Sequence, residues 1–356
     1  SLVAVMWGML LLLRKQWTEN EKLAYPIIQL PMALANEPMS LFRNKLFWTA
    51  FAVAGFIDLV NGLNYQFPML PKIPIVQVIN LKTYFPDRPW VDMGDTFVSF
   101  YPFAIGMAFF IPTDLAFACW FFFIYWKLQR VVASYIGIHG MPGFPFVEEQ
   151  TAGGYYAIAL IALWITRHHF KREFRLFLGR PVEREDPFER KEARIAVGLI
   201  VAGIAFLLYF CRSAGMDWSV ILIFFGLYFL ISIAVTRMRA ELGPPAHDLH
   251  DIGPHFQILK FEGAANMRGD NPFNLIMFAF FNFFNRAYRG HPMPHGLEGF
   301  KLAERFNLDR KRYAAAMGLA IVFGTLCSFF AMLYAFYKHG AAAEIVGPGE
   351  HFGREI

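Results

Sequence analysis

Polar side chains that can hold a proton lie inside a stretch that is otherwise apolar. In residues 55–64, Gly-Phe-Ile-Asp-Leu-Val-Asn-Gly-Leu-Asn, a spacing of three puts Asp58, Asn61 and Asn64 on one side of a helix. A charge at the centre of a bilayer costs roughly 2.5 to 3.5 kcal/mol, so such a carboxylate faces protein or water. Two interpretations stay open. This face lines a cavity that binds a proton or a polar solute, or the helix ends near Asn61 at the membrane surface.

Two cations follow another apolar run. Lys127 and Arg130 come after residues 116–126, Ala-Phe-Ala-Cys-Trp-Phe-Phe-Phe-Ile-Tyr-Trp, and a spacing of three directs both to one side of a helix. They indicate an acidic partner or an anionic ligand, and Glu148 and Glu149 are acidic candidates. The alternative is that the helix ends before the two cations, which then reach up to the lipid headgroups.

The segment Ile-Pro-Thr-Asp at 111–114 joins two apolar stretches with almost no loop. Pro112 ends one helix, and Thr113 or Asp114 can cap the next by accepting hydrogen bonds from its free N–H groups. A break at membrane level is also how transporters build binding sites. Asp114 is therefore a candidate for binding a proton or a solute as well as a capping residue.

Glu148 and Glu149 open a helix after a flexible loop rich in Gly and Pro. The helix dipole favours acidic residues at a helix N-terminus, which accounts for both without a function. A glutamate that faces a cavity would instead bind a proton, and Gly153 and Gly154 would let a neighbouring helix come close. Both explanations stay open.

Signals for metal or cofactor binding are weak. His247 and His250 lie beside Asp residues in a Pro-broken stretch and are weak candidate metal ligands, for which a solvated turn is the alternative. The three cysteines lie in or beside apolar runs and form no Cys-x-x-Cys pair. The signatures of zinc peptidases, serine hydrolases and P-loop proteins are missing. We therefore expect no cofactor, no metal site and no enzyme activity.

The elements that must position these residues are membrane helices. Apolar residues make up 56% of the chain and charged residues 17%, and the mean hydropathy is +0.37. This is too apolar for one soluble core. Since a span needs about 20 apolar residues, the sequence predicts an all-α, polytopic transmembrane helix bundle of about eight spans. The spans are expected near 1–13, 46–62, 97–112, 114–135, 151–166, 194–212, 218–236 and 314–337, and the shorter run 273–284 as a re-entrant or interfacial helix.

Basic residues predict the orientation of these spans. They are dense in 167–193, which the positive-inside rule places in the cytoplasm. Counting spans outward from this loop puts 63–96 outside, and 240–312 becomes a cytoplasmic or re-entrant segment. The net charge of +5 then reflects cytoplasmic loops rather than nucleic-acid binding. We expect a protein integral to the cytoplasmic (inner) membrane.

The chain enters an apolar run directly at Ser1 and ends on polar residues. We therefore expect residues 1–356 to form a single transmembrane domain that is a fragment of a longer chain, since eight spans would be about half of such a protein.

Three short segments resemble one group of membrane proteins. Residues 19–26, Glu-Asn-Glu-Lys-Leu-Ala-Tyr-Pro, resemble the E-x-L-x-[FY]-P segment of oligopeptide transporters and of their relatives that carry metal chelates. Residues 148–155 and 237–245 resemble helix ends of uncharacterised bacterial membrane proteins related to that superfamily. After Pro26 the chain has Ile-Ile-Gln-Leu-Pro where that superfamily has a run of small residues. The resemblance spans roughly residues 15–260 and implies proton-coupled transport of peptides or metal chelates.

Three functions remain in competition. The first is a secondary membrane transporter in which Asp58, Glu148 or Glu149 holds a proton while Lys127 and Arg130 contact an anionic group. The alternatives are a membrane-embedded enzyme acting on a lipid or lipid-linked substrate, with the outer loop shaping its site, and a structural membrane subunit. The expected partners are the lipid bilayer and a small solute, such as a peptide or metal chelate. A homo-oligomer is one assembly that the chain could form, and we expect no nucleic acid.

Overall fold

The computed structural model describes residues 1–36, 38–74, 79–99, 101, 105–106, 108–109, 111–138, 141, 143–182, 187–244, 252–263, 265–267, 271–285 and 290–340. Helices make up 79% of the structure, which confirms the helical part of the predicted fold class. The chain divides into two compact units. The first contains Ser1–Ala24, Thr151–Ala240 and Pro245–Ile356, and the second contains Tyr25–Gln150 and Glu241–Pro244. The single transmembrane domain expected from the sequence stays a prediction.

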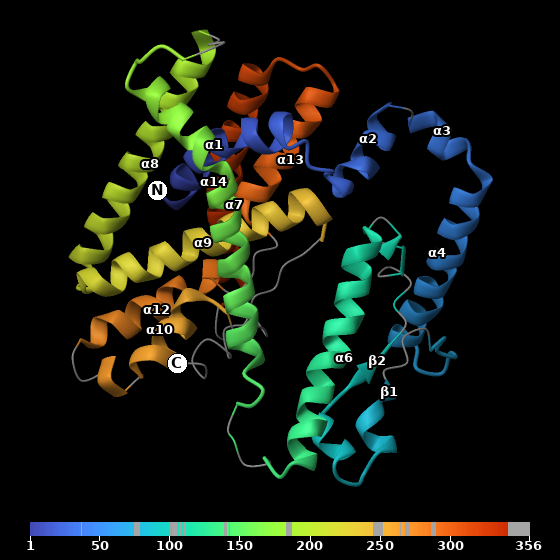
Figure 1. Ribbon diagram of the computed structural model, residues 1–356. Coiled ribbons are helices and arrows are strands. Elements are labelled where there is room, and N and C mark those ends of the chain that lie inside the picture. The colour runs from blue at the N-terminus through green and yellow to red at the C-terminus, as the bar shows by residue number, and fades with distance from the viewer. Residues whose placement is uncertain are drawn as a thin grey trace. The chain divides into compact units, whose positions relative to one another are not determined.

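The first unit is built of helices of different lengths (Figure 1). In chain order they are α1 (Leu2–Lys15), the π-helical turn η1 (Gln16–Asn20), α7 (Val147–Phe177), α8 (Pro187–Ser213), α9 (Trp218–Leu242), α10 (Pro254–Glu262), α12 (Pro272–Asn285), α13 (Pro292–Arg305) and α14 (Arg310–His339). Helix α7 begins in the last residues of the second unit.

Close packing of α1 against α8 depends on glycine. A Cβ atom at Gly8 of α1 would lie 2.6 Å from the carbonyl oxygen of Ala196 in α8. In the reverse direction, a Cβ atom at Gly203 of α8 would lie 2.6 Å from Val5 Cγ2. Small residues on both helices therefore let the two backbones approach, which is the usual packing of helices in membranes.

Aromatic side chains fill the core where α9 meets α10 and α12. The ring of Phe224 on α9 stacks on Phe278 at 5.6 Å between centroids and lies 5.1 Å from Phe281, both on α12. Ile258 of α10 belongs to the same buried cluster. Helix α9 thus lies above α10 and α12 in Figure 1 as the central element of this core.

The second unit combines helices with short irregular elements. These are η2 (Pro26–Ile28), α2 (Gln29–Asn36), α3 (Pro38–Arg43), α4 (Lys45–Gln66), β1 (Ile79–Asn80), η3 (Leu81–Tyr84), η4 (Trp90–Met93), β2 (Phe97–Val98) and α6 (Thr113–Tyr135). Strands β1 and β2 pair antiparallel, with Ile79 opposite Val98 and Asn80 opposite Phe97. This ladder of two-residue strands lies in the predicted outer loop, which folds back on itself.

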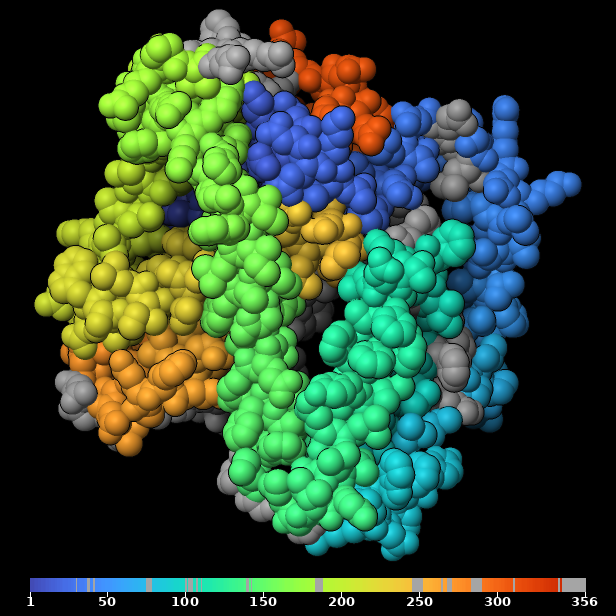
Figure 2. Space-filling view, in the orientation of Figure 1, coloured from blue at the N-terminus to red at the C-terminus, as the bar shows by residue number. Residues whose placement is uncertain are grey.

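Among the described residues, five helices are long and apolar enough to cross a membrane: Lys45–Gln66, Thr113–Tyr135, Phe188–Ser213, Trp218–Leu242 and Lys311–Lys338. None of the described residues of α4 is buried, only 11% of the apolar window of α6 is buried, and both helices are visible at the surface in Figure 2. By contrast, 61% of the apolar window of α9 is buried inside the protein. Apolar surface of this extent fits lipid as the solvent.

The predicted number of spans is not confirmed. Helix α1 has 14 residues, and α7 is long but is not among the five apolar helices. Much of the predicted span 97–112 lies outside the described residues, and its start forms β2. The run predicted as a re-entrant helix is helical, as α12, and its placement in a membrane stays a prediction.

Two local expectations were wrong. The N-cap of α6 is Pro112, with no side-chain hydrogen bond, so Asp114 lies in the first turn instead of capping it. Pro112 has an extended backbone (ψ 141°) and occupies the N-cap itself, so the helix begins at Thr113. The basic segment at 167–177, predicted as part of a cytoplasmic loop, is helical and continues α7.

The α1–α8 contact makes a prediction about Gly203. We expect Gly203→Leu to lower the free energy of unfolding by about 1 to 3 kcal/mol, because the added side chain must push α1 away. The measurement is thermal unfolding of the purified protein in detergent. Gly198→Leu on the same helix is the control, since a Cβ atom there meets nothing within 4 Å. Equal losses in both variants would contradict the role given to this contact.

Candidate functional site

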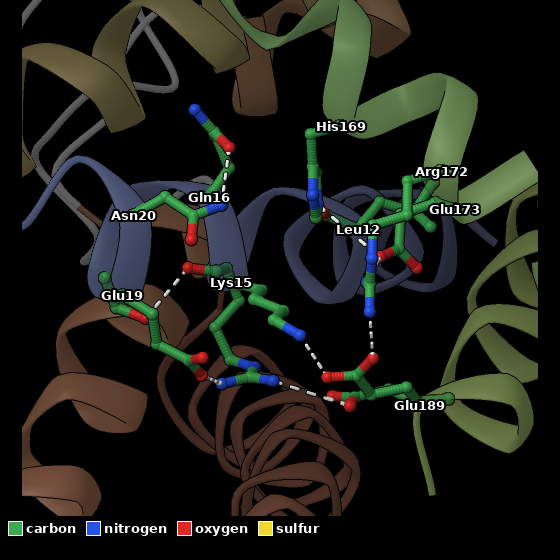
Figure 3. A network of polar contacts seen from close by, with 12 residues as sticks. Leu12, Lys15, Gln16, Glu19, Asn20, His169, Arg172, Glu173 and Glu189 are labelled. Atoms are coloured by element: carbon green, nitrogen blue, oxygen red, sulfur yellow. Dashed lines mark hydrogen bonds and ion pairs between the residues drawn. The ribbon is translucent and has the colours of Figure 1, made fainter. Parts of the chain in front are cut away.

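A network of ionic side chains joins α1, α7 and α8 within the first unit (Figure 3). Glu189 of α8 accepts from Lys15 of α1 through Oε1 and from Arg172 of α7 through Oε2, the second contact measuring 2.6 Å. Arg14 bridges Glu19 and Glu192 at 3.1 and 3.4 Å. Three helices distant in sequence are therefore held by charges that are mostly removed from water.

His169 and Glu173 are the titratable pair at this network. His169 Nε2 donates to the carbonyl oxygen of Leu12 at 2.8 Å and lies 3.7 Å from Glu173 Oε1. Both residues lie beyond the apolar part of α7. Burial lowers the pKa of His169 below its ordinary value, even though the Leu12 carbonyl acts in the opposite direction. Burial also raises the pKa of Glu173 against the attraction of Arg172. Both shifts favour the neutral form.

The helix geometry changes directly after Lys15, at the end of α1. After Lys15 the chain forms the π-helical turn η1, closed by the amide of Glu21 donating to Gln16 O at 2.8 Å. Trp17 is fully buried in this turn, and the Arg237 guanidinium lies 5.7 Å from its ring centroid. Single π-helical turns are rare in proteins. Those that do occur are often found at functional sites.

Further ion pairs continue the network toward α9 and α13. Arg237 of α9 binds Glu21, and Arg239 Nε binds Glu298 Oε1 at 2.5 Å. Lys301 of α13 donates to the carbonyl oxygen of Thr18 at 3.3 Å. Glu21 and Arg237 belong to two of the segments singled out by resemblance, so the structure brings these two segments into contact.

The network fits the predicted orientation of the first unit. The positive-inside rule places the end of α1, the segment 167–193 and the end of α9 on one side of the membrane. Contacts between Lys15 and Glu189, and between Glu21 and Arg237, show that these three places do lie at one end of the unit. That this end faces the cytoplasm stays a prediction.

Lys127 and Arg130 lie apart from this network, in the second unit. Lys127 is buried and donates to the carbonyl oxygens of Asp95 at 2.7 Å and Met93 at 3.4 Å. It binds backbone carbonyls rather than a carboxylate, and so it fastens the outer loop to α6. Arg130, one turn later, lines a polar cavity of about 200 Å³ together with Asp92.

The other sequence candidates are not gathered at that cavity. Asp58, Asp114, Glu148 and Glu149 are all exposed. Asn61 exchanges two hydrogen bonds with the backbone of Ile73, at 2.9 and 3.2 Å, and so orders the loop after α4. Helix α4 continues past Asn61 to Gln66, so Asp58 is not at a helix end.

The weak metal candidates His247 and His250 lie outside the described residues. Among the described residues, no group of three or more His, Cys, Asp or Glu side chains could hold a metal ion.

Sequence reasoning missed the residues that carry this network because it treated 167–193 as a cytoplasmic loop. A signal was present. His169, Arg172 and Glu173 follow the apolar part of α7 at helical spacing of three and four, which continues the helix and puts them on one face. Recognition of that continuation would have placed a His and a Glu beside the end of α1.

Comparison with known proteins places the chain in a family. Residues 1–355 match a family described as "Family of unknown function (DUF6785)". No curated protein and no solved structure matches the chain.

Glu189 should be more important for stability than its exposed neighbours. We expect Glu189→Gln to lower the free energy of unfolding by about 3 kcal/mol, because Lys15 and Arg172 then lose their shared partner in a mostly buried place. Glu19→Gln is the matched control, since its carboxylate is 41% exposed and Arg14 keeps Glu192. It should cost less than about 1 kcal/mol. Thermal unfolding in detergent measures both, and similar losses would contradict a central role for Glu189.

The lowered pKa of His169 predicts a loss of stability in acid. The unfolded chain binds this proton at the ordinary pKa of 6.5, whereas the folded chain resists it. Stability from this group is therefore complete above pH 6.5 and falls as the pH drops toward the folded-state pKa. Glu173 acts oppositely, since its raised pKa adds stability at low pH.

His169→Gln tests this assignment, because the glutamine amide can still donate to Leu12 O. Unfolding of the variant should depend less on pH than that of the wild type just below pH 6.5. Unchanged pH dependence would show that His169 does not titrate as described.

Proposed function

We propose that this chain, which belongs to the DUF6785 family, is a secondary membrane transporter that couples movement of a small solute to protons. The observation that carries the proposal is the His169–Glu173 pair, 3.7 Å apart within a buried ionic network that joins three helices. The five helices of the described part of the chain that could span a membrane provide the setting. The cytoplasmic membrane is the proposed location.

Proton exchange at this pair would be linked to conformation. In the described state, burial favours neutral His169 and neutral Glu173. If water entered between α1 and α7, the penalty for a charge would disappear and both pKa values would return toward their ordinary ranges. At neutral pH, above the ordinary pKa of His169, the difference comes from Glu173, which holds its proton more tightly in the closed state than in the open one. Such a difference in bound protons is what coupling requires.

The surrounding ion pairs would act as a latch between these states. Lys15 and Arg172 from different helices share Glu189, and a cavity of about 10 Å³ beside them is near the lower limit for one water molecule. Separating α1 from α8 would break the Lys15–Glu189 and Arg14–Glu192 pairs together. Because several ion pairs must break at once, a partly opened state is costly. This favours two discrete states, closed and open.

Features of the second unit bear on the alternatives. A lipid-modifying enzyme needs an outward-facing catalytic acid beside a cation, and Asp92 with Arg88 at 3.6 Å is the arrangement nearest to this. Asp92, however, already uses Oδ2 to accept a hydrogen bond from Ser134 and to face Arg88, so this oxygen is engaged within the unit. The resemblance to oligopeptide transporters points instead to solute movement and to peptides or metal chelates as its cargo.

Transport is tested with the whole chain in proteoliposomes. We expect a proton gradient to drive uptake of at least one solute in a panel of peptides, metal chelates and amino acids. Glu173→Gln should reduce that uptake to the level seen without a gradient, since the variant cannot exchange the proton. Glu19→Gln, an exposed carboxylate of the same network, should keep the dependence on the gradient. Absence of gradient-driven uptake across the panel would overturn the proposal.

A further inference from the structure

A small polar cavity in the second unit contains one cationic and one anionic side chain. Its volume is about 200 Å³, and its lining includes Arg130 and Ser134 from the end of α6 and Asp92 from η4. Arg130 and Asp92 come from different elements and do not pair with each other within 4 Å, although both line the same space. The cavity therefore separates two opposite charges.

The Arg130 guanidinium is held in place but is not neutralised. No hydrogen-bond acceptor or ion-pair partner of Arg130 is found among the described residues. Gly94 lies directly against it, since a Cβ atom there would be 2.7 Å from Arg130 Nη1. Gly94 also has a φ of +70°, which disfavours any side chain. Lys127 fixes this turn by its hydrogen bond to Asp95 O, so the guanidinium is presented to the cavity by a fastened backbone.

Asp92 has one carboxylate oxygen in use and one available. Oδ2 accepts from the Ser134 hydroxyl and lies 3.6 Å from Arg88 Nε. Oδ1 has no partner among the described residues. A planar guanidinium matches a carboxylate with two parallel hydrogen bonds, and a free carboxylate oxygen matches an ammonium group. Together they suit a solute that carries both charges.

A larger apolar cavity adjoins the polar one. Its volume is about 590 Å³, and it shares Ala133 and Phe144 with the polar cavity. Its other lining residues are mainly apolar, among them Val132, Ile136 and Phe146. An apolar group attached to a solute in the polar cavity could therefore leave water by entering this space.

We propose that the cavity binds a zwitterionic amino acid with an apolar side chain, such as leucine. Its carboxylate contacts Arg130, its ammonium contacts Asp92, and its side chain enters the adjoining apolar cavity. A polar cavity of 200 Å³ corresponds to about seven water molecules, which suits one amino-acid head group rather than a metal chelate. As the solute site of the transporter, this inference rests on the proposed function. The opposite charges distinguish it from a site for a simple anion.

The test is calorimetric titration of the purified full chain in detergent with four ligands. Leucine should bind, whereas N-acetylleucine, which has no ammonium, and leucinamide, which has no carboxylate, should each bind at least about tenfold more weakly. Glycine, without the apolar side chain, should also bind at least about tenfold more weakly. Absence of leucine binding, or equal binding of all four ligands, would overturn the inference.

Two variants test which charged group of leucine contacts Arg130 and which contacts Asp92. Arg130→Gln should weaken leucine binding at least about tenfold but leave leucinamide as in the wild type. Asp92→Asn should weaken leucine binding similarly but leave N-acetylleucine unchanged. Lys72→Gln is the control, because it removes an exposed cation of the same predicted outer loop outside the cavity. Wild-type leucine affinity in both site variants would contradict the assignment. Thermal unfolding checks that each variant folds. If a variant does not fold, the titration of the wild type with the four ligands still tests the inference.

The outcomes separate this inference from the transport proposal. Leucine binding that depends on Arg130, without gradient-driven uptake of any solute, would contradict transport alone. Gradient-driven uptake of another solute, without leucine binding, would contradict the leucine site alone.

Discussion

Charge compensation at the end of α1 holds the first unit together. Glu189 receives Lys15 from α1 and Arg172 from α7, and Glu192 receives Arg14. A carboxylate with two cationic partners is stable in a mostly buried place only while both partners remain. The positions of α7 and α8 beside α1, and hence the environment of His169 and Glu173, therefore depend on these pairs as well as on glycine packing. The pairs also restrict how α1 can move.

The sequence predicted the kinds of element better than their connections. Long apolar runs predicted α4, α6, α8, α9 and α14, because length and hydropathy are local properties. The basic character of residues 167–193 was taken for a loop, because charges dominate its composition. The same charges instead find partners across α1, α7 and α8. Pairing between distant segments is not visible in one sequence, so hydropathy cannot distinguish a solvated basic loop from a buried ionic layer.

At the candidate site, too, local features were predicted and contacts between distant segments were not. The spacing of Lys127 and Arg130 correctly placed both on one side of a helix, since helical periodicity is local. Their partners depend on how the outer loop folds: Lys127 binds backbone carbonyls at 93 and 95, and Arg130 lies against Gly94. Backbone carbonyls carry no sequence signal, so these partners could not be predicted. Asn80 similarly orders this loop by bonding Asp95, whose pKa that hydrogen bond and Lys82 lower.

The π-helical turn at Gln16–Asn20 limits how this segment can change in length. Its amide-to-carbonyl bond spans five residues rather than four, so deletion of one residue would restore ordinary α-helical geometry locally. Because the amide of Glu21 would then donate across four residues instead of five, Glu21 would keep its place one turn after Gln16 and would still meet Arg237. Deletion of a second residue would rotate Glu21 by about 100° around the helix axis and turn it away from Arg237. Relatives that keep the Glu21–Arg237 pair should therefore tolerate the loss of one residue in this segment but not of two.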